Sequence, residues 1–302
     1  MQISTSNFYR QQTDAMQESN TKIAILQNQI SSGKKVNIPS DDSVSFSEIA
    51  LHKNLLSRLD QYAKNINMAK QRLSTEDNAI GQTINVMTRI NEISVQSQND
   101  TYSATDRQAM AVEIQNLTDT ILTFANTKNS DGSSLFGGYV ADGDPFKKND
   151  DGSISYLGDT NHVSTVLNET SSLVVNANGN DLYMSVSQKN GVKKSIFESI
   201  NGLISTLKAG QRPTSDQSDE IINSINHLTF QQTICGARLE RADSEVAIND
   251  VKKTDTLARL SALEDTDITS AVSEMKQKMN TLEASQASFV KISQLSLFNY
   301  LK

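Results

Sequence analysis

The chain has 302 residues, of which 36% are hydrophobic and 5% aromatic, with no Trp and three Pro. This composition is poor for a thick globular core and suits long amphipathic helices that share a narrow seam. The formal net charge of −7, without any Lys/Arg cluster, argues against a nucleic-acid partner. Cys235 is the single cysteine, which excludes an internal disulfide and a thiolate metal cluster.

Targeting signals are not evident in the sequence. The N-terminus is rich in Ser, Thr, Gln and Asn and lacks the apolar core of a signal peptide. No segment approaches about 18 consecutive apolar residues, so membrane insertion is not expected. Taken alone, these two features predict a cytoplasmic protein.

Residues 1–40 are expected to form an N-terminal assembly helix, over 1–32, and a loop. Gly33 has the position of a glycine that ends a helix, and Pro39 keeps the preceding residue out of the α region. Ser40 is the expected N-cap of the next helix, with the following Asp pair in its first turn. The first helix has a sparse apolar stripe made of Ile3, Phe8, Met16, Ile23, Leu26 and Ile30.

Residues 41–128 are expected to form the N-terminal part of a helical rod, and they carry the strongest helical pattern. Apolar residues recur mainly at steps of three and four, which is a heptad seam that requires a partner helix. The seam consists of Leu55, Leu59, Tyr62, Ile66, Ala69, Leu73, Ile80, Ile84 and Met87. A shorter helix is expected over 106–125.

Residues 129–194 differ in character and are expected to form a β-rich outer domain. The segment is rich in Gly, Asp, Asn and Ser and contains short β-branched runs. Strands are expected near 154–157, 163–167 and 173–175, with turn signals at 150–153 and 178–181.

The C-terminal part of the rod is expected over 195–264, and a C-terminal assembly helix over 265–302. Gly210 and Pro213 end a short helix, and a long helix begins near Ser215. Cys235 lies on the seam of that helix, so a buried small side chain is favoured over a reactive thiol. The last helix has an apolar stripe made of Ile268, Val272, Met275, Met279, Leu282, Phe289, Ile292 and Leu295, and Leu297 and Phe298 join its expected interface.

Together the segments predict a mainly α protein with a β-rich insert. The N- and C-terminal halves are expected to form an elongated antiparallel helical bundle or coiled-coil rod, with the small β domain at its tip. A single long helix cannot bury its own apolar stripe, so the terminal helices are expected to order only against partners. We therefore expect them to form an inter-subunit coiled-coil layer in a polymer.

Catalytic, metal and cofactor sites are not expected. The segment 31–34 fits the S-x-x-K pattern of serine acyl enzymes, but the companion motifs are absent and a helix end explains the residues. His52, His162 and His227 are scattered and lack the spacing of a zinc site. The acidic residues of 142–151 lack the order of an EF-hand and favour turns.

Several motifs resemble those of the flagellin-like family of bacterial flagellar axial proteins. The loop Ser31–Asp42 and the segment Glu264–Asp267 carry the likeness to the whole family. Other segments are similar to its hook–filament junction branch: Ile3-Ser4-Thr5 with Phe8-Tyr9, Leu135-Phe136-Gly137-Gly138-Tyr139, Asp144-Pro145-Phe146, Tyr156-Leu157-Gly158-Asp159, Asn178-Gly179 and Ser296-Leu297-Phe298-Asn299-Tyr300-Leu301.

This resemblance implies a structural subunit without enzymatic activity or cofactor, located between the first hook-associated junction protein and flagellin. It further implies self-association in a ring, an export chaperone at the C-terminal helix, and export to the extracellular flagellum without a cleaved signal peptide. Two alternatives stay open. One is a minor or lateral flagellin, and the other is an adhesin or an enzyme on a flagellin-like scaffold.

Overall fold

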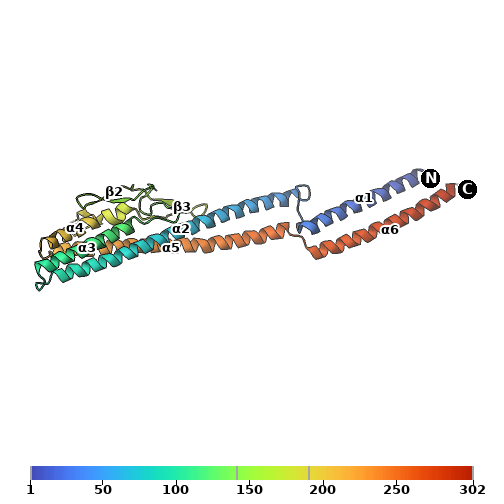
Figure 1. Ribbon diagram of the computed structural model, residues 1–302. Helices are drawn as coiled ribbons and strands as arrows, with labels where there is room; N and C mark the ends of the chain where they lie inside the picture. Colours follow the sequence, from blue (N-terminus) through green and yellow to red (C-terminus); the bar gives the residue numbers. More distant parts are fainter. Residues whose placement is uncertain (1, 141, 190, 301–302) are drawn as a thin grey trace. The chain divides into compact units, whose positions relative to one another are not determined.

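The computed structural model describes residues 2–140, 142–189 and 191–300, and the side chains of residues 6–293 within these ranges. Long helices dominate, and the chain forms short β-hairpins after α3 and before α4 (Figure 1). The predicted class, mainly α with a β-rich insert, is confirmed. The helices are α1 (Gln2–Ser32), α2 (Ser43–Ser97), α3 (Ala104–Ala125), α4 (Ile196–Lys208), α5 (Ser215–Glu264) and α6 (Ile268–Tyr300).

The chain divides into two compact units. One unit contains residues 59–250, and the other combines 1–58 with 251–302. Helices α2 and α5 contribute to both units, while α1 and α6 belong to the second alone.

In the unit 59–250, α2 and α5 run antiparallel, as cross-contacts of opposite sequence order show. Asn249 donates a side-chain hydrogen bond to the Leu59 carbonyl, and Cys235 donates one to the Leu73 carbonyl. Both helices repeat a buried position every seven residues, which is the spacing that keeps a seam facing its partner. On α2 these positions are Leu59, Ile66, Leu73, Ile80, Met87 and Ser94, and on α5 they are Ile221, Leu228, Cys235, Ala242 and Asn249.

Helices α3 and α4 pack together and widen this seam into a core. Each begins with a capping box, Ser103 with Asp106 on α3 and Ser195 with Glu198 on α4, which satisfies free N–H groups of the first turn. The core face of these helices consists of Ala111, Ile114, Ile121, Ile200, Leu203 and Leu207, all buried.

The insert contains three antiparallel two-stranded hairpins. They pair β1 (Phe146–Lys148) with β2 (Ile154–Tyr156), β3 (Ser164–Val166) with β4 (Ser172–Val174), and β5 (Val186–Ser187) with β6 (Lys193–Lys194). Two of the three expected strands are present in shortened form and the third is displaced by one residue, whereas β1 and the β5–β6 hairpin were not predicted. The apolar run 182–184 lies in a π-helical turn, Asn180–Met184, that points Leu182 and Tyr183 into the core.

Aromatic side chains join the insert to the helices. The rings of Phe146 and Tyr183 meet edge-on with centroids 5.2 Å apart, and Phe136 meets Tyr183 at 5.7 Å. Tyr183 also stacks on Phe197 of α4 at 5.9 Å. All four side chains are buried, so the insert and the helices share one hydrophobic core.

Buried or half-buried polar side chains of α2 and α5 hold two segments of the insert. Arg72 donates to the carbonyls of residues 134 and 135, and Arg238 donates to the carbonyl of Asn176. Glu76, which is completely buried, accepts the N–H of Ala177 at 2.9 Å. Burial raises the pKa of Glu76 to about 7, against the lowering effect of that N–H and of the two arginines.

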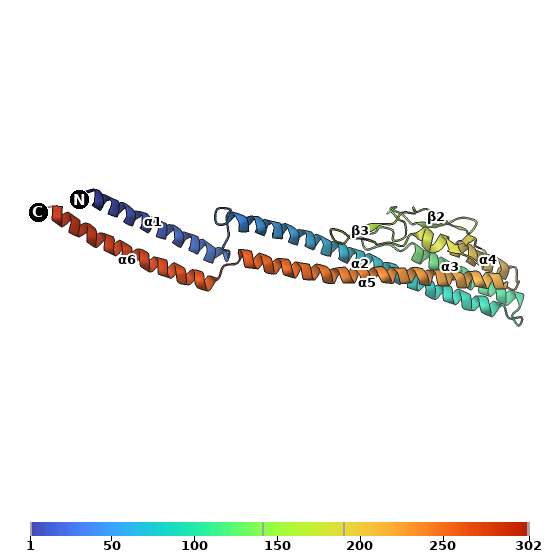
Figure 2. The same ribbon diagram turned by 180° about the vertical axis from the view of Figure 1, so that it is seen from behind.

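In the other unit, α1 and α6 run antiparallel and lie side by side in both views (Figures 1 and 2). The start of α2, up to residue 58, and the end of α5, from residue 251, complete this unit. Leu26, Val36, Ile49 and Ala271 are its buried apolar residues among the described side chains.

Candidate assembly interface

Helix α1 meets α6 along a single stripe. Seven of the less exposed positions of α1 alternate by steps of three and four, and they are Tyr9, Gln12, Met16, Ser19, Ile23, Leu26 and Ile30, with Phe8 and Gln29 beside them. This heptad spacing keeps one stripe toward the partner along the whole helix. Two of the seven positions, Gln12 and Ser19, are polar, so this seam buries less apolar surface than the α2–α5 seam.

The matching stripe of α6 has the same spacing and a similar mixture of residues. It consists of Ala271, Met275, Lys278, Leu282, Ser285 and Phe289, with Val272 beside it. The rings of Tyr9 and Phe289 meet edge-on at 5.4 Å and join the outer part of the pair.

The structure separates the predicted interface residues into two groups. The side chains of Phe8, Ile23, Leu26, Ile30, Val272, Met275, Leu282 and Phe289 are at least partly covered within the chain. Ile268, Met279 and Ile292 are instead 52%, 43% and 41% exposed. The side chains of Ile3, Leu295, Leu297 and Phe298 lie outside the described part of the structure.

The expected place of Met279 in the stripe of α6 differs from the structure. The repeat continues from Met275 to Lys278 and Leu282, and it is Lys278 that is partly covered. A lysine can cover apolar surface with its methylene stem while its ammonium group stays in water. Met279 is one residue further along, about 100° around the helix, and points away from the seam.

Three of the four exposed large apolar residues described on α6 lie on one side of the helix. Ile268, Met279 and Val290 follow one another at intervals of 11 residues, and all three are exposed. Eleven residues correspond to three turns plus about 20°, so the three side chains lie on nearly the same side of the helix. We call Ile268, Met279 and Val290 the outer face of α6. Val290 was not among the predicted interface residues.

The loop after α1 caps α2 in a different way from the one expected. Asp42, not Ser40, is the N-cap, since its Oδ1 accepts the N–H groups of Val44 and Ser45 at 3.0 Å. Hydrogen bonds from Ser45 lower the pKa of Asp42. Asp41 folds the loop by accepting two loop N–H groups, so the helix begins at residue 43.

Helix α6 is capped in the same way, by an Asp of the preceding linker. Asp267 Oδ1 accepts the N–H groups of Thr269 at 3.0 Å and Ser270 at 3.2 Å, and hydrogen bonds from Ser270 lower its pKa. At the other linker, Gly33 has φ +71°, the left-handed conformation predicted for a glycine that ends a helix.

A groove of about 330 Å³ lies between the end of α1 and the following linker. Two exposed isoleucines, Ile25 on α1 and Ile38 on the linker, contribute to its lining. The other lining residues are polar: Asn28, Gln29, Ser31, Ser32, Asn37 and Asp41.

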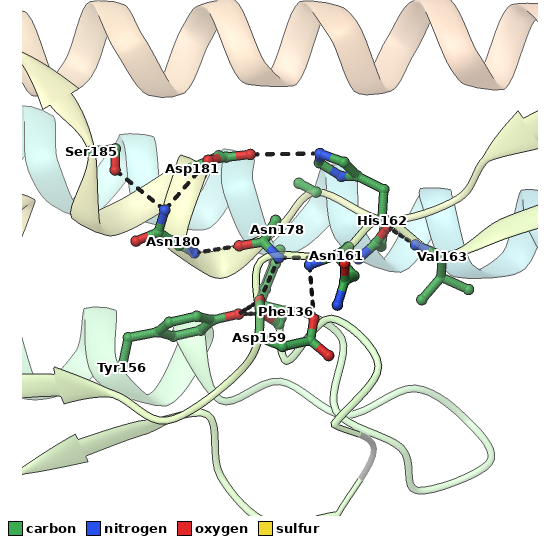
Figure 3. Close-up of polar contacts among 12 residues, drawn as sticks. Phe136, Tyr156, Asp159, Asn161, His162, Val163, Asn178, Asn180, Asp181 and Ser185 are labelled. Carbon is green, nitrogen blue, oxygen red and sulfur yellow. Dashed lines mark hydrogen bonds and ion pairs between the residues drawn. The ribbon is translucent and has the colours of Figure 1, made fainter.

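Three of the insert motifs quoted for the resemblance, those that contain Phe136, Tyr156 with Asp159, and Asn178, come together in space (Figure 3). The Tyr156 hydroxyl donates to the carbonyls of Phe136 at 2.9 Å and Asp159 at 2.8 Å. Asn178 donates to the Asp159 carbonyl at 2.6 Å, and the Asp159 carboxylate accepts the N–H of Tyr139 at 3.1 Å. The motifs are thus parts of one hydrogen-bonded structure that closes the insert.

Two glycines of these motifs lie where the Cβ of any other residue would collide with neighbouring atoms. Gly138 has φ +71°, and a Cβ there would collide with the Asp159 side chain. A Cβ on Gly179 would lie 2.7 Å from the Phe136 carbonyl oxygen and 2.8 Å from the Tyr156 ring.

Two of the three histidines, which the sequence leaves scattered, lie close together in the structure. His162 and His227 both meet Asp181, the first at its carboxylate (3.7 Å) and the second at its carbonyl (2.8 Å). Within residues 2–140, 142–189 and 191–300, no three His, Cys, Asp or Glu side chains are grouped to hold a metal ion. Cys235 is buried, and burial raises the pKa of its thiol. Among the described helices, none has an apolar stretch long enough to cross a membrane.

The sequence matches known proteins along its entire length. Residues 3–141 match the family model of the bacterial flagellin N-terminal helical region. The chain is 24% identical to flagellar hook-associated protein 3 of Escherichia coli, with 100% of both chains covered. It is 23% identical to a flagellin of Listeria monocytogenes, over 91% of this chain and 90% of that one.

The fold agrees with these likenesses. The crystal structure of flagellar hook-associated protein 3 from Legionella pneumophila superimposes with a TM-score of 0.65 at 19% identity, covering 71% of this chain and 98% of that one. Its likeness shows the shared fold, and the full-length sequence match to the E. coli protein selects the branch. The chain is thus similar to flagellar hook-associated protein 3 along its whole length and to the flagellin family over its N-terminal part, and these likenesses support a structural protein of the flagellar hook–filament junction.

Proposed function

We propose that this chain joins the hook to the filament by continuing a common helical lattice through its α1–α6 pair. On the hook side it contacts the first hook-associated junction protein, and on the filament side it contacts flagellin. Copies of the chain associate in a ring. The name of the E. coli relative and the end-to-end match to it support this assignment.

The observation that carries the assembly mechanism is the outer face of α6. Ile268, Met279 and Val290 are exposed although the seam with α1 is already formed by other residues. A repeated apolar face that its own chain leaves uncovered favours contact with another protein. In this proposal the seam residues hold α1 against α6, and the outer face packs against neighbouring subunits.

The remaining interface residues take their places in the same scheme. Ile292, which is 41% exposed, lies about 160° around the helix from Val290 and makes a contact separate from the outer face. Ile3, Leu295, Leu297 and Phe298 act near the ends of the pair. An export chaperone covers the C-terminal helix before assembly, because an exposed apolar face would otherwise associate early. Export then proceeds without a cleaved signal peptide, and the assembled subunit is extracellular.

A gene deletion tests the junction role. Cells should retain hooks, lack filaments and release flagellin into the medium, as electron microscopy and immunodetection of flagellin would reveal. Intact filaments in the deletion strain would contradict the proposal and would favour an adhesin or an enzyme on the same scaffold.

A second candidate function is that of a minor or lateral flagellin. The match to Listeria flagellin over most of both chains favours it, but that match is weaker than the one to the E. coli junction protein. In the deletion strain this function predicts hooks without filaments and without released flagellin, which separates it from the junction role.

A further inference from the structure

The linker that follows α1 and the linker that precedes α6 are joined by backbone hydrogen bonds. The N–H of Lys35 donates to the carbonyl of Glu264 at 2.8 Å, and the N–H of Thr266 donates to the carbonyl of Gly33 at 2.9 Å. Between them, Lys34 and Asp265 form an isolated antiparallel bridge. The end of α1 is therefore tied directly to the start of α6.

The side chain of Glu264 lies at the centre of this connection. Only 8% of it is exposed, and its Oε1 accepts a hydrogen bond from Lys53 Nζ of α2 at 2.9 Å. The same oxygen is paired with Lys34 Nζ. Lys35 Nζ donates to the Ala262 carbonyl at 2.7 Å, which adds a third lysine to the end of α5.

These contacts keep Glu264 charged in spite of its position. Burial acts to raise the pKa of Glu264, but the hydrogen bonds and charges of Lys34 and Lys53 outweigh it and hold the pKa below its usual value. A covered carboxylate with two lysine partners has little freedom to move, because loss of either partner leaves a charge poorly compensated.

The seam between α1 and α6 does not by itself fix the register of the two helices. Gln12 and Ser19 on one helix and Lys278 and Ser285 on the other interrupt the apolar positions. A coiled-coil seam with few apolar residues specifies its register weakly, since a slip of one heptad exchanges similar residues. The linkers are the place at which a single register is imposed on the pair.

We propose that Lys34, Lys53 and Glu264 form a charge lock that closes the two linkers and sets the register of α1 against α6. Glu264 is the positioning residue, because both lysines meet its carboxylate. The consequence for assembly rests on the proposed function, in which the α1–α6 pair makes the lattice contacts. The lock itself is a property of the single chain.

Amide hydrogen exchange in the purified full-length protein tests the lock. The reporters are the N–H groups of Lys35 and Thr266, which close the two linkers. Glu264→Gln keeps the shape of the side chain and removes its charge, and it should speed exchange at both amides by about tenfold or more. Glu274→Gln, at an exposed position of α6, is the matched control and should leave both amides unchanged.

Salt provides a readout that packing alone would not give. Raising the salt concentration from about 0.05 to about 1 M should speed exchange at the two amides in the natural protein, since both lysines are half exposed and open to screening. The same change should have little effect in Glu264→Gln. Equal exchange in the natural protein and Glu264→Gln, or an equal salt response in both, would overturn the proposal.

The two proposals can fail separately. The deletion phenotype tests the junction role without reference to Glu264, and amide exchange is measured without any flagellar partner. Lost protection in Glu264→Gln supports the lock whatever the deletion strain shows, and unchanged protection rejects it even if the strain sheds flagellin.

Discussion

Replacing Glu76 with Gln should change how the stability of the unit 59–250 depends on pH. Glu76 is completely buried on α2 and accepts the N–H of Ala177 in the insert. Gln keeps the size of the side chain and a carbonyl acceptor for that N–H, but it cannot ionise. The substitution therefore isolates the effect of the carboxyl proton.

The magnitude follows from the pKa. Burial raises the pKa of Glu76 from 4.5 to about 7 in the folded chain. Because the folded state holds the proton more tightly than the unfolded state, this residue stabilises the fold fully below about pH 4.5 and loses that contribution as pH rises through about 7. At about 1.4 kcal/mol per pKa unit, the difference of about 2.5 between the folded and unfolded pKa amounts to roughly 3.5 kcal/mol in total.

The assay is urea unfolding at about pH 5 and about pH 8, monitored by near-UV circular dichroism, to which the buried Tyr183 contributes. The natural protein should lose roughly 2.5 kcal/mol more than Glu76→Gln between the two pH values, because part of the contribution is already lost at about pH 5. Taking the difference between the two proteins cancels groups that titrate equally in both. Glu240→Gln, at an exposed position of α5, should behave as the natural protein does. The same pH dependence in Glu76→Gln and the natural protein would refute the reasoning.

Three further predictions concern the interface and the insert. Met279→Asp, on the outer face of α6, should alter monomer stability by no more than about 0.5 kcal/mol but abolish filament attachment. Leu282→Asp, in the seam, should abolish attachment and also weaken the α1–α6 pair by about 1–3 kcal/mol, measured by amide exchange. Normal filaments in cells that carry Met279→Asp would argue against an outer contact. Gly138→Ala should destabilise the insert more than Gly132→Ala, because both sites have positive φ but only the first would place Cβ against a side chain, and equal melting temperatures would contradict this. Phe146→Ala should cost about 3–5 kcal/mol in urea unfolding, because its ring fills the centre of the aromatic cluster; a loss below about 1 kcal/mol would mean that the core does not depend on it.

Local patterns in the sequence were sufficient to predict the helices. The heptad positions of α2 from Leu59 to Met87 are buried in the structure, and Cys235 occupies the seam position expected for it. Such patterns succeed because burial along a helix repeats with a short period that depends only on the helix itself. The class of the insert followed from its turn residues for a similar reason.

Structural features that depend on contacts between distant parts of the chain could not be predicted from the sequence. Ser40 and Asp42 are both good capping residues, and the choice is made by Asp41, which folds the loop around its own carboxylate. The run around Tyr183 is apolar and short, and only its packing against Phe136 and Phe146 shows that it forms a helical turn.

Two features of the candidate interface could not be predicted from the sequence, because they also depend on how distant segments pack. Met279 and Lys278 both fit the three- and four-residue steps between Met275 and Leu282, so spacing could not distinguish them, and only the burial pattern of the folded pair does. Glu264 carries no local signal of burial, since its partners Lys34 and Lys53 lie more than two hundred residues away in the sequence. A charged residue at the end of a helix is ordinarily exposed, and only the folded linkers reveal its role.

The seven-residue repeat shared by α2 and α5 also limits how this protein can change in length. The helices pair Leu59 with Asn249 and Leu73 with Cys235, so their repeats advance together in opposite directions. One residue inserted into α2 alone would rotate everything beyond it by about 100° and expose the buried side. Seven residues inserted at matched points of both helices would instead add one complete repeat and keep every later contact in phase. The helix pair can therefore be lengthened or shortened only in paired steps of about 10 Å, which makes the heptad the unit in which variants of this protein can be designed.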